Sequence, residues 1–335
     1  MLFRSAVDVT SSGCAAPAPA AVAIALGIDA SHPDLAVVAD SGCNAVSLID
    51  VTPGNPFGTF GTVTNTIALS GTVPERVATI SRLGHAVVSN SGSNNASIVD
   101  LVGGTELSTV ATGTQPLGVA INQDTGFAVV TNAGSNTISV FDANAGGTAG
   151  IVATDRRPIA VAIDPNRNIA LVANALQGTL QVFTLSASNS ATFSKSIIIG
   201  SSTIPPLPTS IVFDPASTLF LAASPLSDAF LLVNTDQGAA QSIRVGINPT
   251  SLAYNYLAST LVTVNTENNT LSTVDVQLPG AVHTTAIQGL GNTAPCPVDS
   301  NTGATLCGVD IHPLTNLVVV TDPAHNRVLL FPPAK

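Results

Sequence analysis

The chain is poor in charge and in the residues that build exposed helices. Only 9% of its 335 residues are charged, Trp is absent, and Glu and Lys occur three times and twice. Surface helices rely on long, straight side chains of this kind, so their scarcity argues against an α-helical protein. Small residues that suit strands and tight turns are abundant instead, including 27 Gly. The composition therefore predicts an all-β protein.

The scarcity of basic residues also excludes two kinds of partner. Ten Lys and Arg are spread along the whole chain, and the net charge is −10. Nucleic acids and anionic membrane surfaces attract clustered basic side chains, and no such cluster is present in the sequence. The longest apolar run, residues 14–28, contains two prolines and is shorter than the ~20 residues of a membrane span. We expect no nucleic-acid partner and no membrane insertion.

The amino terminus does not read as a signal peptide. Asp8 lies where the apolar region of such a peptide belongs. We therefore expect either that a secretion signal has been removed or that the sequence is an excerpt of a longer chain. A secreted repeat protein fits the low charge and the many Ser, Thr and Asn residues. The expected setting is extracellular or periplasmic, as a monomer or as part of a longer chain.

A repeated turn organises the sequence. Seven times along the chain an aliphatic segment ends in Asp, Asn or Ser. Four residues after that residue, Asn, Gly or Asp opens the next segment, and successive repeats begin 41–57 residues apart. This period is that of a four-stranded propeller blade, at roughly 40–50 residues. The first residues, called anchors below, are Asp40, Asn90, Asn132, Asn174, Ser224, Asn265 and Asp322. The partners four residues later are Asn44, Asn94, Asn136, Gly178, Asp228, Asn269 and Asn326.

The turn chemistry follows from these residue types. Short Asx side chains bond nearby backbone and tolerate left-handed conformations. Gly42, Gly92 and Gly134 stand inside three of the turns, and we expect them to adopt positive φ. Most of these polar residues are interpreted as turn formers rather than ligands.

Seven such units fill the chain, which predicts a seven-bladed β-propeller in a single domain, residues 1–335. The aliphatic segments, such as 127–130 and 317–320, are apolar at consecutive positions, as strands are when both faces of their sheet are covered. The last unit supplies only three strands, and residues 2–9 have strand character, so we expect the N-terminal strand to complete the last blade. The approximate blades are 20–71, 72–114, 115–156, 157–205, 206–247, 248–304, and 305–335 with 1–13.

The third unit resembles a known repeat. Residues 113–121, followed by 128–132 and 136–142, are similar to the YVTN-type β-propeller repeat and, more distantly, to the NHL repeat. Ser224 and Asp228 depart from that pattern in the fifth unit, and a Cys-containing insertion replaces the leading proline segment in the seventh. The family is defined by its repeat alone. The resemblance implies a propeller and often an extracellular setting, and it carries over no catalytic residue.

The four cysteines form no C-x-x-C pair, which argues against a zinc site and for disulfides. The expected pairs are Cys14 with Cys43 and Cys296 with Cys307, and buried free thiols are the alternative. Two motif matches are discounted. The glycine-rich residues 289–294 lack the helix of a dinucleotide site, and residues 164–168 lack the later Gly and Glu of a calcium loop. We expect no cofactor and no metal site.

The remaining candidates gather where the innermost strands begin, around the mouth of the central channel. They form either a structural rim network or a binding site for an anionic or sugar-like ligand. They are Glu75, Arg76, Gln115, Arg156, Arg157 and Asn248.

The sequence favours a non-catalytic binding scaffold whose loop face and channel mouth engage a protein, a glycan or a small anionic ligand. The alternative is a propeller hydrolase or lyase of the lactonase type acting at the channel mouth. That alternative needs paired carboxylates or histidines on the axis, for which Glu75, Asp310 and His312 are the candidates.

Overall fold

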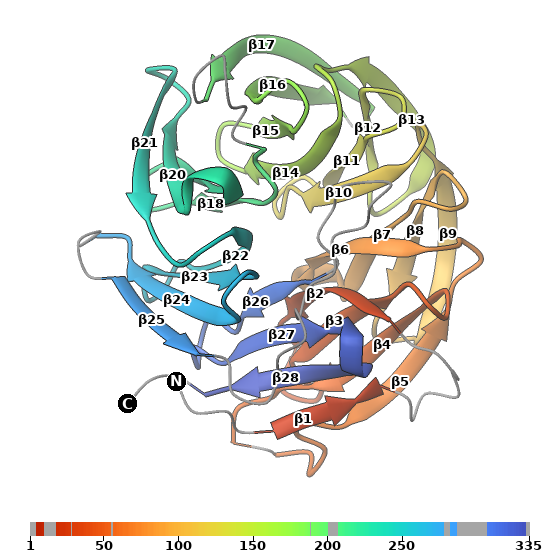
Figure 1. The fold of residues 1–335 in the computed structure, drawn as a ribbon. Helices are drawn as coiled ribbons and strands as arrows, with labels where there is room; N and C mark the ends of the chain where they lie inside the picture. The colour runs from red at the N-terminus through yellow and green to blue at the C-terminus, as the bar shows by residue number, and fades with distance from the viewer. Residues whose placement is uncertain are drawn as a thin grey trace.

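The computed structural model is a seven-bladed β-propeller in which each blade is a four-stranded antiparallel sheet (Figure 1). The predicted fold class is thus confirmed. The structure describes residues 5–9, 18–27, 29–54, 56–187, 189–199, 207–277, 282–286 and 307–332. Within these ranges no helix is long and apolar enough to cross a membrane.

The first four blades run in chain order from the innermost strand to the outermost. Blade 1 contains β2 (Pro19–Ala25), β3 (Leu35–Asp40), β4 (Ala45–Asp50) and β5 (Val63–Ala68). Blade 2 contains β6 (Pro74–Ile80), β7 (His85–Asn90), β8 (Asn95–Asp100) and β9 (Thr105–Ala111). Blade 3 contains β10 (Pro116–Ile121), β11 (Phe127–Asn132), β12 (Thr137–Asp142) and β13 (Gly146–Ala153). Blade 4 contains β14 (Pro158–Asp164), β15 (Ile169–Asn174), β16 (Thr179–Ala187) and β17 (Ser190–Ile198).

The last three blades complete the ring. Blade 5 contains β18 (Ile211–Asp214), β19 (Leu219–Ser224), β20 (Ala229–Asn234) and β21 (Ala239–Arg244). Blade 6 contains β22 (Pro249–Asn255), β23 (Thr260–Asn265), β24 (Thr270–Asp275) and β25 (Val282–Ala286). Blade 7 contains β26 (Val309–Ile311), β27 (Val318–Asp322), β28 (Arg327–Phe331) and β1 (Ser5–Asp8).

The amino-terminal strand completes the last blade, as the sequence predicted. β1 pairs antiparallel with β28, from Ser5 opposite Leu330 to Asp8 opposite Arg327. Blade 7 therefore takes its outermost strand from one end of the chain and its three inner strands from the other. β26 also contacts β2 of blade 1, which closes the ring on its inner side. The pairing covers the edge that β28 would otherwise expose.

The core lies between the blades. One apolar cluster occupies each of the seven junctions between neighbouring sheets. At the junction of blades 3 and 4, Val129 and Val140 pack with Val161 and Val172. Both faces of every sheet are covered in this way, and this is why the second and third strands are apolar at consecutive positions.

The positive φ angles of the repeated turns fall on the residue four positions after the anchor, which is Gly178 in blade 4 and Asx in the other blades. All seven residues four positions after an anchor are left-handed, with φ between 50° and 65°. The prediction for Gly92 and Gly134 was wrong, because neither has positive φ. These glycines are needed for close approach instead. A Cβ at Gly92 would lie 2.7 Å from Thr72 Oγ1, and one at Gly134 would lie 2.8 Å from Thr114 Oγ1.

The anchors are structural. The Asn132 side-chain amide is buried and donates to Thr137 Oγ1 at 3.0 Å and Ser139 Oγ at 2.9 Å. Asn265 repeats this pattern in blade 6. Their interpretation as turn formers agrees with these contacts.

Two of the four cysteines lie within the described residues. Cys43 lies in the turn between β3 and β4, Cys307 precedes β26, and neither is a free thiol. Cys14 and Cys296 lie outside the described residues, so the expected pairing stays a prediction.

Candidate functional site

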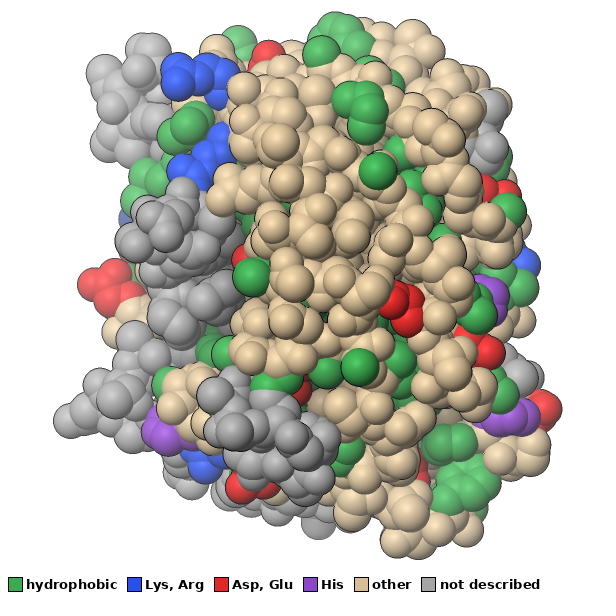
Figure 2. All heavy atoms as spheres, turned by 90° about the vertical axis from the view of Figure 1, so that its right-hand side faces the viewer, with side chains coloured by type: hydrophobic (Ala, Val, Ile, Leu, Met, Phe, Trp, Pro, Cys, Tyr) green, Lys and Arg blue, Asp and Glu red, His purple; other side chains and the backbone are tan. Residues whose placement is uncertain are grey.

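Charged side chains are few on the flank of the molecule that Figure 2 shows. Figure 2 shows the flank, where the outermost strands expose polar uncharged side chains and backbone with few charged groups between them. β13 contains no charged residue, and β9 contains only Glu106. This flank therefore offers few groups that could bind a charged ligand. The mouth of the channel lies on one face of the propeller.

Prolines fix the start of the innermost strands, as the sequence indicated. β6, β10, β14 and β22 each begin at a proline, and Pro208 comes shortly before β18. The residue before each proline is left-handed, with φ between 41° and 60°. Non-glycine residues in this region cost about 1–3 kcal/mol each and tend to occur at functional sites. The five residues are Val73, Gln115, Arg157, Leu207 and Asn248, which we call the rim.

Turns of the preceding blade hold the rim in place. The Gln115 backbone N–H donates to Asn94 Oδ1, and that of Arg157 donates to Asn136 Oδ1, both at 2.8 Å. The left-handed turn residue of one blade thus fixes the rim residue of the next blade. This hydrogen bond explains why an Asx residue recurs four positions after the anchor.

The structure separates the sequence-predicted residues into two layers. Gln115, Arg157 and Asn248 belong to the rim, whereas Glu75 and Arg76 follow the proline and lie deeper. Arg156 is exposed and Arg157 is half-buried. Of the described residues that line the central cavity, Arg76 is the one that the sequence had singled out.

The central cavity has a volume of about 110 Å³, and its wall combines Arg76 with Gly, Ala and Ser residues and with Val and Ile side chains. In each blade, one residue in or directly before the innermost strand lies opposite the second-strand residue that comes just before the anchor. Six of these seven innermost residues are Gly, Ala or Ser. The seventh is Arg76. The set, which we call the inner ring, is Ala21, Arg76, Gly118, Ala160, Ser210, Ser251 and Gly308.

Small side chains are required in this ring because the inner strands approach closely. A Cβ at Gly118 would lie 2.7 Å from the carbonyl oxygen of Ile159 in the next blade. A Cβ at Gly308 would lie 2.6 Å from the Cα of Ala21. A long side chain at any one position therefore has space only because its neighbours are short.

The Arg76 guanidinium is held beside a buried carboxylate. Its Nη1 donates to the Glu75 carbonyl oxygen at 3.0 Å. Glu75 is 3% exposed, and its Oε1 accepts a bond from Ser91 Oγ at 3.0 Å. Burial lowers the pKa of Arg76, and the Glu75 carboxylate acts in the opposite direction. Arginine nevertheless remains protonated in proteins, so the cavity contains a permanent cation.

Hydroxyl groups lie on the part of the cavity wall formed by blades 5 and 6. Ser210 Oγ accepts the Leu252 N–H at 3.2 Å, which leaves its own O–H able to donate. Ser251 Oγ donates to the Cys307 carbonyl oxygen at 2.7 Å. The cavity thus combines one guanidinium and the Ser210 hydroxyl with Gly, Ala, Val and Ile residues, and these two donors suit a small oxygen-rich anion.

Asp310 and His312 are engaged with neighbouring groups. The Asp310 carboxylate accepts the backbone N–H of Ile24 at 2.6 Å and that of Ile311 at 2.8 Å. Burial raises its pKa to about 6. His312 is fully buried, and its Nε2 lies 3.0 Å from Asp34 Oδ2. Its Nδ1 accepts the Leu314 N–H at 3.3 Å, so Nε2 carries the proton and donates to Asp34.

His312 occupies a turn position that other blades fill with Asx. In blade 4 the corresponding Asp164 Oδ1 accepts the N–H of the residue two positions on, as His312 Nδ1 does. Asn255 Oδ1 does the same in blade 6. His312 is therefore a turn cap. Within the described part of the chain no group of three or more His, Cys, Asp or Glu side chains is arranged to bind a metal ion.

Comparison with known proteins gives the fold alone. No family model and no curated protein matches the chain. Virginiamycin B lyase from Staphylococcus aureus superposes with a TM-score of 0.71 at 10% identity, covering 99% of this chain and 100% of that one. A catalytically inactive variant of that lyase with quinupristin gives 0.73 at 12% identity, with the same coverage. Hydrazine synthase from Kuenenia stuttgartiensis gives 0.72 at 16% identity, covering 96% of this chain and 97% of that one.

Proposed function

We propose that this protein is a non-catalytic binding scaffold of the extracellular space or periplasm. Its loop face and channel mouth engage a protein, a glycan or a small anionic ligand. The YVTN-type repeat remains our hypothesis for its family. The secreted setting is supported by the low charge of the sequence and by the absence of free thiols among the described cysteines.

The observation that carries the proposal is the position of Arg76. It is the one charged side chain of the inner ring, and it lines the cavity together with Gly118, Ala160, Ser210 and Ser251 of that ring. A guanidinium has five N–H donors in a planar fork that matches carboxylate oxygens. Arg157 and Asn248 of the rim are half-buried and directly precede the prolines at which β14 and β22 begin.

The test is calorimetric titration with citrate and glucuronate as probes. Replacing Arg76 with Ser copies the residue of blades 5 and 6, so the fold should tolerate Arg76→Ser. We expect the variant to lose about tenfold or more in affinity, because a hydrogen bond to a charged group contributes about 1.5–3 kcal/mol. Arg157→Ala should weaken binding less, since that side chain does not line the cavity.

Arg156→Ala is the matched control, because Arg156 is an exposed arginine of the same loop region. Its affinity should equal that of the wild type. The site is wrong if neither probe binds the wild-type protein, or if Arg76→Ser binds as tightly as the control.

The enzymatic alternative, a hydrolase or lyase of the lactonase type, would use an acid–base group at the same mouth. Glu75 is the buried carboxylate there. Turnover of a lactone that is lost in Glu75→Gln would establish this alternative over the binding scaffold.

A further inference from the structure

A second and larger cavity lies on the face opposite the channel mouth, between blades 1 and 2. Its volume is about 220 Å³. The turn from β2 to β3, together with β4 and β5, forms one wall, and the turns that flank β7 and β8 form the other. Most of its wall is apolar, including Leu48, Leu101 and Val102.

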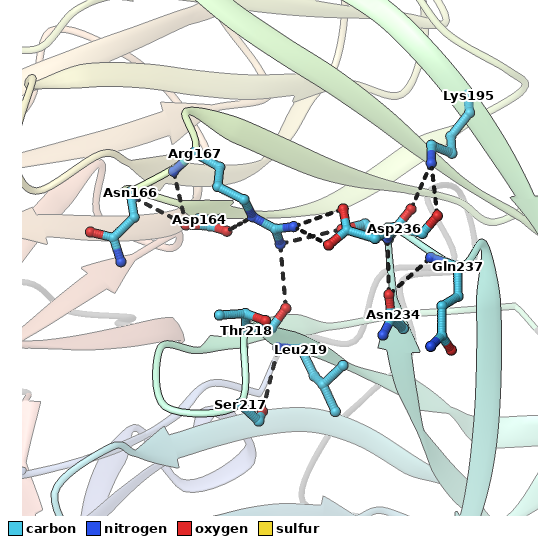
Figure 3. A network of polar contacts seen from close by, with 11 residues as sticks. Asp164, Asn166, Arg167, Lys195, Ser217, Thr218, Leu219, Asn234, Asp236 and Gln237 are labelled. Carbon is cyan, nitrogen blue, oxygen red and sulfur yellow. Dashed lines mark hydrogen bonds and ion pairs between the residues drawn. The ribbon is translucent and has the colours of Figure 1, made fainter.

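The corresponding junction of blades 4 and 5 is filled by an ionic network (Figure 3). Arg167 extends from the turn between β14 and β15 towards blade 5, where its Nη1 bonds both Asp236 oxygens at 2.9 Å. Its Nε bonds the buried Asp164, and its Nη2 reaches Thr218 O and Thr235 Oγ1. Lys195 Nζ joins from β17 by donating to the Thr235 carbonyl oxygen at 2.8 Å.

Strand register relates the two junctions residue by residue. Leu48 pairs with Asn65 in blade 1 as Val182 pairs with Lys195 in blade 4. Two positions before its second strand, blade 1 has Pro33 and blade 4 has Arg167. Immediately before its second strand, blade 2 has Gly84 and blade 5 has Thr218. The two residues after the third strand are Leu101 and Val102 in blade 2, and Thr235 and Asp236 in blade 5.

These replacements coincide with a cavity at one end of the junction of blades 1 and 2, and its wall is apolar at these positions. Pro33 removes the guanidinium, Gly84 removes a side chain, and Leu101 and Val102 replace a hydroxyl and a carboxylate. A cation, which the network of blades 4 and 5 accommodates, would find no counter-charge at these positions. An uncharged apolar group would instead bury its surface favourably against Leu48, Leu101 and Val102.

Two polar side chains stand on the wall of the same cavity. His32 is held by a bond of 2.8 Å between its Nδ1 and Asp29 Oδ1. Asn65 faces the cavity from β5, with its Oδ1 accepting the Thr66 N–H. The His32 Nε2 and the Asn65 Nδ2 can therefore hydrogen bond with a polar group that an apolar ligand carries. Apolar pockets with a few such polar groups are the usual form of small-molecule sites.

We propose that the cavity between blades 1 and 2 is a second binding site, for a small aromatic or branched aliphatic molecule with one hydrogen-bonding group. The occupant fills the space that Arg167 fills between blades 4 and 5. This site is independent of Arg76 and of the channel.

The experiment is a ligand-observed NMR titration with indole and 4-methylphenol. We expect saturable binding to the wild-type protein with a Kd of about 1 mM or tighter. Pro33→Arg combined with Val102→Asp rebuilds the network of blades 4 and 5 inside the cavity. It should weaken binding by about tenfold or more. Leu107→Asp is the matched control, because Leu107 and Val102 are similarly exposed at 48% and 50% and Leu107 does not line the cavity.

The proposal is overturned if neither probe binds, or if the double variant binds as well as Leu107→Asp. If the double variant does not fold, the backbone amide shifts of the wild type decide. Saturable shifts confined to Gly27, Gly84 and Val102 support the site, and shifts centred on Arg76 or elsewhere contradict it.

Discussion

The anchor asparagines show at the residue scale how one side chain can specify a turn. Asn132 lies at the end of β11, and its amide donates to two hydroxyls of β12. The amide is short enough to stay within the blade, and it is buried from water. Ser and Asp fill the same position in blades 5 and 1, where different hydrogen bonds serve the turn.

Asn132→Ala should lower the free energy of unfolding by about 1–3 kcal/mol, since it removes two buried hydrogen bonds and leaves their acceptors without the amide. Urea denaturation followed by circular dichroism measures this change. Asn144→Ala, at an exposed turn position in the same blade, should stay within about 0.5 kcal/mol of the wild type. Equal effects of the two substitutions would show that the anchor is not a structural centre.

Asp310 makes stability depend on pH. Burial raises its pKa from 3.8 to about 6 in the folded protein. A raised folded-state pKa favours the folded state below pH 3.8, and this contribution is lost as pH rises through about 6. Between pH 4 and 7 the wild type should lose about 1–2 kcal/mol, less than the shift alone implies because Asp310 is only half-buried.

Asp310→Asn should remove that dependence. Its urea midpoint should change less between pH 4 and 7 than that of the wild type. Asp34, whose pKa is lowered, contributes in the opposite sense and chiefly below pH 4. A slope in Asp310→Asn that matches the wild type would assign the dependence to another group.

At the scale of elements, the Arg167 network links the turns of two neighbouring blades. Asp164 is 1% exposed and Asp236 is 75% exposed in their bonds to Arg167. The two ion pairs therefore contribute differently to the free energy of unfolding. A buried charge is strongly destabilising once its partner is removed, whereas an exposed pair contributes little.

Arg167→Met should destabilise the protein by about 3 kcal/mol, since it leaves the Asp164 carboxylate buried without its guanidinium. Asp236→Asn should cost less than about 1 kcal/mol. Thermal melts of both variants test this order. A larger effect of Asp236→Asn would mean that the link between blades, rather than the buried charge, carries the stability.

At the scale of the whole molecule, closure of the ring depends on four residues from the opposite end of the chain. Val7 is 5% exposed and packs in the cluster between blades 7 and 1, while Ala6 on the other face of β1 is exposed. Deleting residues 1–8 should expose the edge of β28 and cause aggregation or loss of cooperative unfolding.

Scanning calorimetry and light scattering measure that outcome. Ala6→Ser, which keeps the pairing and changes only the exposed face, should melt like the wild type. An unchanged melting transition in the truncated protein would show that the strand does not hold the ring closed.

The sequence alone determined the number of blades, the place of most strands and the role of the amino-terminal strand. These features follow from local signals, namely the Asx turn, the proline before the inner strand and the apolar segments. It also placed Glu75 and Arg76 at the start of an innermost strand. It assigned positive φ to the wrong turn residue, because only the contacts of Gly92 and Gly134 with the preceding loop show what those glycines are for.

Only the tertiary structure decided which side chains share a site. Arg76 lines the cavity because the other blades place small residues beside it, and no single repeat contains that information. Asp310 and His312 bond to Ile24 and Asp34 of blade 1, which are distant in the chain and adjacent only after the ring closes. The cavity between blades 1 and 2 likewise forms only where turns of two blades meet beside the apolar cluster of their junction.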